Sequence, residues 1–220
     1  MKGVLLKDLY IAGSNVVVTV IMLAVLGFGL SFLMEPSAIL ILAPGITTIP
    51  AFISITSDVA AKWNKNVITM PLSRNKVIGE KYLLYSILAV LGLLLSIVIC
   101  IILGLFGEKV SLDTLCLYGV IGMSATFLAG GLSLPCAYFF DADKAQIAFM
   151  ISFIASTGII TGMVLLINTF IPVKEYVLQT FLSVFVISLA WFVASYCVSA
   201  KIYKRQDILY AALGMFQKKC

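Results

Sequence analysis

The chain has 220 residues, of which 62% are hydrophobic and only 11% are charged. Soluble domains hold about 45–50% apolar residues, so this composition excludes an ordinary soluble domain. Histidine is absent, which excludes histidine-based metal sites and Ser–His or Cys–His nucleophilic pairs.

Six long apolar stretches fill the chain, and nearly all charges lie between them. Each is near or above the ~20 residues that an α-helix needs to cross a hydrocarbon core. Backbone groups in lipid must be satisfied within their own segment, so each stretch is predicted to be a transmembrane helix. The predicted spans are 16–34, 38–57, 82–106, 112–140, 145–171 and 176–200. We therefore expect an all-α membrane protein with one membrane domain, 1–220.

The segment 1–15 precedes the first span and carries an apolar stripe that includes Leu5, Leu6 and Leu9. A short helix of this kind is predicted to lie in the membrane interface and to connect to the first span. Gly13, with the two polar residues after it, is typical of a corner between the two segments.

The second span is predicted to be broken. Pro44 and Pro50 lie within it and weaken a helix, and Gly45 adds to the effect. The turn at 35–37 must also reverse the chain in very few residues. Residues 35–50 therefore form either part of a full span or a re-entrant hairpin. Carbonyls freed at a broken helix can bind a cation, so an ion-coupled secondary transporter with its site here is the alternative function.

The longest non-membrane stretch is 58–80, and its first half is predicted to be an amphipathic helix. Asp58 stands where an N-cap belongs, and Pro71 ends the helix. Lys62 and Lys65 lie on the polar face. The apolar face, at helical spacing, consists of Val59, Trp63, Val67 and Met70.

The basic residues predict the topology. Thirteen of the 15 lysines and arginines lie at the N-terminus, at 62–81, at 144 and in the tail 201–220. The positive-inside rule then places both termini and the loop 58–80 in the cytoplasm. This distribution also explains the net charge of +5 without nucleic acid binding, and a lipid membrane is the expected partner.

No catalytic or metal centre is predicted. The sequence has no phosphate-binding loop of the G-x-x-x-x-G-K-[ST] type, and its five cysteines form no C-x-x-C pair. Asp141 and Asp143 fit a solvated turn better than an acid/base pair. No charged residue falls in the middle of a span, whereas ion-coupled transporters commonly place ionisable groups there. We expect neither an enzyme nor a cofactor of its own.

The run 58–83, DVAAKWNKNVITMPLSRNKVIGEKYL, resembles the first cytoplasmic loop of ABC-2-type transporter permeases from Gram-positive bacteria. There an acidic residue, a K-W pair, a T-x-P-[IL]-S-R turn and a K-Y-L entry to the third span recur in this order. The start, M-K-G-x-x-x-K-D, is similar to the N-terminal connecting helix of the same permeases.

The resemblance implies a six-span half-transporter in a bacterial cell membrane. It would pair with a second, identical or homologous, permease subunit. A separate cytoplasmic ABC ATPase would bind ATP and Mg²⁺. The coupling helix that docks on the ATPase would contain Asp58, Val59, Lys62, Trp63, Lys65, Val67 and Met70.

The resemblance extends to permeases that export small amphipathic peptide toxins or bacteriocins, including phenol-soluble modulins. An amphipathic or hydrophobic cargo also suits a path lined by aromatic residues and methionine. By family analogy, the translocation path on spans two and five would include Phe52, Phe149, Met150, Phe153 and Met163. Whether such a chain serves export or immunity stays open here.

Overall fold

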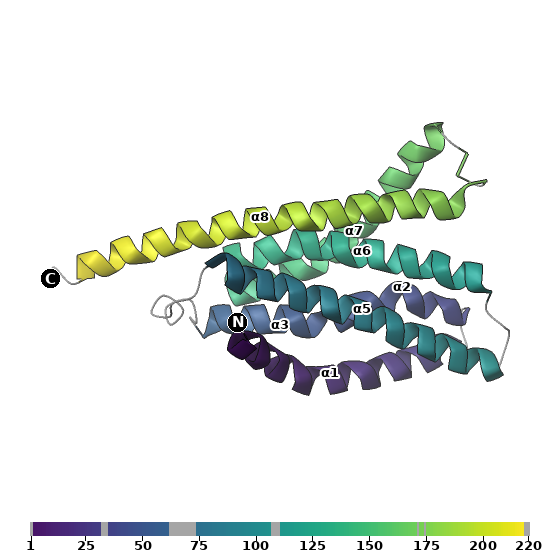
Figure 1. Ribbon diagram of the computed structural model, residues 1–220, viewed down its shortest axis with the longest axis horizontal. Coiled ribbons are helices and arrows are strands. Elements are labelled where there is room, and N and C mark those ends of the chain that lie inside the picture. The colour runs from purple at the N-terminus through teal and green to yellow at the C-terminus, as the bar shows by residue number, and fades with distance from the viewer. Residues whose placement is uncertain are drawn as a thin grey trace.

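The computed structural model describes residues 2–31, 35–61, 74–106, 111–170, 172–173 and 175–217, and all regular structure in these ranges is helical (Figure 1). The prediction of an all-α protein is therefore confirmed for this part of the chain. The helices are α1 (Lys2–Ser31), the 3₁₀ turn η1 (Pro36–Ala38), α2 (Ile39–Thr47), α3 (Ile49–Ala60), α5 (Arg74–Phe106), α6 (Leu112–Phe139), α7 (Ala142–Phe170) and α8 (Val177–Gln217).

Five segments among the described residues are long and apolar enough to cross a membrane. They are Ile39–Ala60, Asn75–Gly104, Leu112–Phe139, Asp143–Phe170 and Val177–Tyr203. The chain is thus a multi-pass membrane protein. The apolar part of α1, Asn15–Gly29, is shorter, and residues 32–34 of the first predicted span lie outside the described ranges. Six spans therefore remain a prediction.

Successive long helices run in opposite directions. In Figure 1, α1 begins and α8 ends at the end of the bundle where α3 ends and α5 begins. This arrangement follows because each span crosses the full length of the bundle and the next one returns. It agrees with the prediction that both termini and the loop 58–80 share one side.

One terminal segment differs from the sequence prediction, and the other extends the last predicted span. α1 continues without a break through Gly13, so the predicted corner is not present. An unbroken helix keeps its backbone groups paired, which a corner at the membrane would not. At the other terminus, α8 continues for 41 residues to Gln217, so the tail prolongs the last helix.

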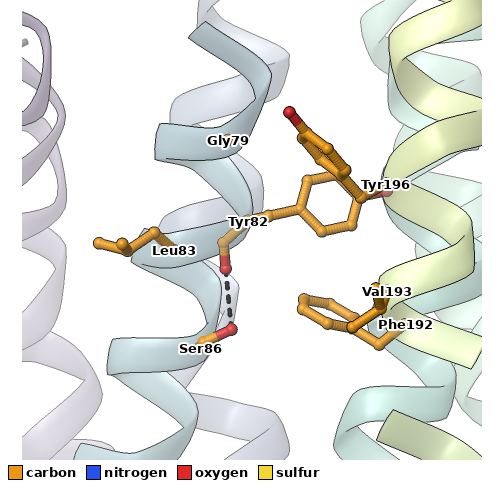
Figure 2. Close-up of a pocket in the computed structure, with 7 residues that line it drawn as sticks. All are labelled: Gly79, Tyr82, Leu83, Ser86, Phe192, Val193 and Tyr196. Carbon is orange, nitrogen blue, oxygen red and sulfur yellow. Dashed lines mark hydrogen bonds between the residues drawn. The ribbon is translucent and has the colours of Figure 1, made fainter. Parts of the chain in front are cut away.

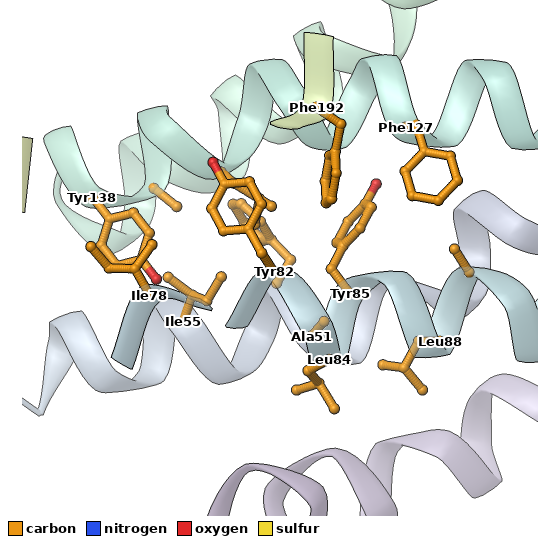
Figure 3. Packing of buried hydrophobic residues seen from close by; sticks show 14 of the residues in the cluster. Ala51, Ile55, Ile78, Tyr82, Leu84, Tyr85, Leu88, Phe127, Tyr138 and Phe192 are labelled. Carbon is orange, nitrogen blue, oxygen red and sulfur yellow. The ribbon is translucent and has the colours of Figure 1, made fainter. Parts of the chain in front are cut away.

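The core is centred on α6, which packs most extensively against α8, α7 and α2. Two glycines of α6 permit close packing: a side chain at Gly131 would overlap Trp191 of α8, and one at Gly130 would overlap Tyr85 of α5. Figure 3 shows the aromatic part of the core, where Phe192 of α8 lies between Tyr82, Tyr85 and Phe127 with ring centroids 5.0 to 5.7 Å away.

Candidate functional site

The second span is one helix with a local irregularity at Thr48. Thr48 has φ −82° and ψ −11°, close to helical values, and α2 and α3 run on in the same direction in Figure 1. Together Ile39–Ala60 gives 22 residues of a candidate span. The structure therefore favours the full span over the re-entrant hairpin.

The threonines at this irregularity donate hydrogen bonds to backbone carbonyls that lie between the two prolines and just before Pro44. Thr47 Oγ1 donates to the carbonyl oxygens of Ala43 and Pro44, both at 3.0 Å. Thr48 Oγ1 donates to the carbonyl oxygen of Gly45 at 2.7 Å. Such hydroxyl bonds re-satisfy backbone groups around a helix break in a membrane. The carbonyls of Ala43, Pro44 and Gly45 therefore already accept hydroxyl hydrogen bonds, which does not favour the cation site that the alternative function requires.

A pocket of about 590 Å³ opens between the second span and the first half of α7, with α6 behind it. From the second span come Gly45, Ile49 and Phe52, and from α6 comes Thr126. The residues from α7 follow helical spacing, so one face of that helix forms the wall. They are Gln146, Phe149, Met150, Phe153 and Thr157.

Aromatic rings close the gap between α3 and α7. Phe52 and Phe149 are stacked, with ring centroids 4.3 Å apart and planes at 29°. Phe153 meets Phe149 edge-on at 5.0 Å, and its ring lies so near Gly45 that a Cβ there would be 2.8 Å from Phe153 Cε1. Gly45 is thus required for the ring to fit over the second span.

Four of the five residues proposed for the translocation path line this pocket: Phe52, Phe149, Met150 and Phe153. Met163 does not, because it packs two to three turns further along α7 against the cluster of Leu128, Ile160 and Val184. Sequence reasoning missed Gln146 and Thr157. Both could have been found from sequence, because they lie at helical spacing from Phe149 and Phe153 and therefore on the same face of the helix.

The pocket has mostly apolar walls with a few polar groups. Gln146, Thr126 and Thr157 are its polar side chains among the described residues. Both threonine hydroxyls donate within their own helices, to the carbonyls of Gly122 and Phe153. Concave apolar sites of several hundred Å³ with few polar groups are typical of sites for apolar or amphipathic molecules. The described residues include no group of three or more His, Cys, Asp or Glu side chains that could hold a metal ion.

The proposed ATPase-coupling residues fall partly outside the described ranges. Lys62, Trp63, Lys65, Val67 and Met70 lie outside them, so their helix stays a prediction. Asp58 and Val59 belong to α3, which ends at Ala60. Asp58 therefore lies in the last turn of α3 and not at the N-cap position that the sequence predicted.

Asp58 instead forms an ion pair that sequence reasoning missed. Its Oδ2 lies 2.7 Å from Lys81 Nζ, and both side chains are largely buried, at 14% and 4% exposed. Lys81 Nζ also donates to Ser54 Oγ at 2.9 Å. The sequence marks Lys81 only as one more basic residue beside a span, because nothing local signals a partner 23 positions away.

A second cleft, of about 380 Å³, lies between α5 and α8 (Figure 2). Its main polar group, the Tyr82 hydroxyl, already forms hydrogen bonds between the two helices. It lies 2.9 Å from Ser195 Oγ and 2.7 Å from Ser199 Oγ. Tyr196 donates its hydroxyl to the carbonyl of Asn75 at 3.0 Å. We interpret this cleft as the seam where α5 and α8 are joined.

The family model for ABC-2 family transporter proteins matches residues 3–204, nearly the whole chain. The chain belongs to this family and is a membrane permease of an ABC transporter. Membership implies an ATPase partner and a membrane location. Comparison with curated proteins gave no match, and comparison with solved structures gave none.

Proposed function

We propose that the chain is the permease subunit of an ATP-driven exporter in a bacterial cell membrane, with an amphipathic or hydrophobic cargo. Small toxin or antimicrobial peptides are the cargo class that the pocket and the loop resemblance together favour. The single observation that supports the proposal most is the family match over residues 3–204, which includes the loop 58–80.

In this proposal the chain is not itself an enzyme. A separate cytoplasmic ABC ATPase binds ATP and Mg²⁺ and supplies the energy, and a second permease subunit, identical or homologous, completes the pathway. The loop after α3 docks on the ATPase through the apolar face that contains Trp63, with both termini on the same cytoplasmic side. The positive charges near the loop favour that side.

The pocket between the second span and α7 is the proposed site of cargo entry. Its aromatic walls accept the apolar face of an amphipathic peptide. Gln146 offers hydrogen bonds to polar groups, and Thr157 Oγ1, which donates to a carbonyl within α7, can accept one. Met150, which is 69% exposed, stands at the opening, and methionine adapts its shape to varied apolar partners. Movement of α3 relative to α7 separates Phe52 from Phe149 and opens the pocket.

The test uses vesicles that contain the chain together with the ABC ATPase that copurifies with it. ATP-dependent accumulation of a dansylated amphipathic helical peptide in inside-out vesicles is the expected result. A partner that carries a substitution of its phosphate-loop lysine is the matched control and should show none. Movement of the probe by the chain alone under a sodium or proton gradient would instead support an ion-coupled secondary transporter.

A further inference from the structure

The ion pair between Asp58 and Lys81 joins the two ends of the cytoplasmic loop. α3 ends at Ala60 and α5 begins at Arg74, so everything between these helices is attached to the bundle beside this pair. The contact is short, 2.7 Å between Asp58 Oδ2 and Lys81 Nζ, and the side chains are 14% and 4% exposed. Water screens such a buried pair far less than a surface pair.

Asp58 lies at a position in its helix where a carboxylate needs a nearby positive charge, and Lys81 supplies it. Asp58 lies two residues before the end of α3, near the negative end of the helix dipole, where a carboxylate is disfavoured. Lys81 offsets this charge, and Ser54, one turn earlier on α3, accepts a further hydrogen bond from Lys81 Nζ at 2.9 Å. The Lys81 ammonium on α5 thus contacts α3 at two residues, Asp58 and Ser54.

The same helix carries the pocket. Phe52 and Ile53 of α3 line it, while Ser54 and Asp58 meet Lys81 on α5. Phe52 and Asp58 are six residues apart, about 9 Å along the axis at 1.5 Å per residue. A shift of one end of α3 therefore moves the other end with it.

We propose that Lys81, with Asp58 and Ser54, is the strut that transmits movement of the cytoplasmic loop to the pocket wall. Without the pair, α3 is joined to the loop only through the backbone after Ala60, and movement of the α5 end of the loop no longer reaches α3. Lys81 is in this sense a positioning residue, because it acts on the pocket only through α3. This inference rests on the proposed function, since it needs an ATPase that moves the loop.

The test measures how fast a cysteine in the pocket reacts with a maleimide. Ile53→Cys is introduced into a chain without its native cysteines, and the chain is assembled with the ATPase in nanodiscs. ATP should change the labelling rate when the ion pair is intact. In Asp58→Asn or Lys81→Gln, the rate with ATP should equal the rate without it, although ATP is still hydrolysed.

Two further variants separate transmission from simple loss of folding. The exchange Asp58→Lys with Lys81→Asp should restore a nucleotide-dependent rate, which destabilisation alone would not. Lys76→Gln, the matched control on the exposed face of α5, should keep the full effect. Ser54→Ala, which leaves the ion pair in place, should reduce the effect without abolishing it.

The outcomes distinguish the two proposals. A nucleotide effect that persists unchanged in Asp58→Asn, Lys81→Gln and Ser54→Ala would overturn the strut and leave the exporter function standing. No nucleotide effect in the chain with its ion pair intact would overturn the strut, and the exporter function would be overturned with it only if the vesicles also showed no ATP-dependent accumulation of the peptide. Each rate is measured on the monodisperse fraction, so a smaller yield of folded protein does not alter it.

Discussion

Gly122 of α6 lies against the carbonyl oxygen of Leu40, so closely that any side chain at position 122 would overlap it. Leu40 is the residue four positions before Pro44, whose nitrogen has no hydrogen to donate to that carbonyl. Gly92 of α5 lies equally close to Thr47 Oγ1 of α2. Two glycines on neighbouring spans therefore allow α5 and α6 to pack closely against the weakened helix.

Gly122→Ala should lower the free energy of unfolding by about 1–3 kcal/mol, the usual effect of overpacking. The added methyl group would have to push α2 and α6 apart. Titration with a denaturing detergent, followed by helical circular dichroism, measures the change.

Gly158→Ala is the matched control, because nothing lies within 4 Å of the Cβ that it adds to α7. It should be neutral or stabilise by about 0.5–1 kcal/mol through the better helix propensity of alanine. Equal effects of the two substitutions would contradict the close approach of α2 and α6.

Tyr82→Phe should destabilise the joint between α5 and α8 by about 1 kcal/mol, the typical net value of a buried hydrogen bond. The phenol hydroxyl bridges Ser195 and Ser199, at 2.9 and 2.7 Å, and its removal leaves both serines without this partner. Tyr176→Phe, at an exposed tyrosine, should leave unfolding unchanged. Additive effects of Tyr82→Phe and Ser199→Ala in the double variant would argue against a direct bond.

The positions of the helices could be predicted from sequence, because long apolar segments are stable in lipid and the polar segments between them are stable in water. The span predicted at 112–140 is α6, Leu112–Phe139, and the one predicted at 38–57 covers α2 and most of α3. The predicted break near Pro44 and Pro50 is also present, as an irregularity at Thr48.

The contacts between helices could not be predicted in the same way. In a span, residues that face lipid and residues that face protein are equally apolar, so Met163 and Phe153 look alike in sequence. Only Phe153 reaches the pocket. The pairing of Asp58 with Lys81 is equally hidden, because it depends on how α3 and α5 lie side by side.

The topology gives a third prediction. Lys65→Cys, in a chain without native cysteines, should react with a membrane-impermeant maleimide only after cells are opened. The excess of basic residues on this side requires it, because such loops are retained in the cytoplasm. Lys109→Cys, beside the connection on the opposite side, is the control and should react in intact cells. Reaction of position 65 in intact cells would reverse the orientation and remove the docking role of the loop.

Docking of the ATPase gives a fourth prediction, on a residue outside the described ranges. Trp63→Ala should weaken binding of the ATPase subunit by about 2 kcal/mol or more, because buried aromatic anchors commonly dominate interfaces. Copurification from detergent, with the affinity measured by surface plasmon resonance, tests this. Asn64→Ala, off the apolar face, should bind normally. Unchanged binding of Trp63→Ala would leave Trp63 as an anchor at the membrane interface.

The pocket gives the last prediction. Phe149→Ala should weaken binding of the dansylated amphipathic peptide about tenfold or more, since burial of a phenylalanine contributes about 1.5–3 kcal/mol. Phe149 is the better residue to truncate, because it is only partly buried, whereas Phe52 is fully buried and its truncation also opens a cavity. Fluorescence titration of the probe with the assembled transporter gives the dissociation constants.

Met163→Ala separates a role in binding from a role in packing. Its side chain packs against Leu128, Ile160 and Val184, away from the pocket, so its truncation should lower stability by about 2 kcal/mol or more and leave probe binding unchanged. Phe170→Ala, at an 87% exposed residue on the far end of α7, should change neither quantity. Probe binding that falls equally in Phe149→Ala and Met163→Ala would mean that the cargo does not enter between Phe52 and Phe149.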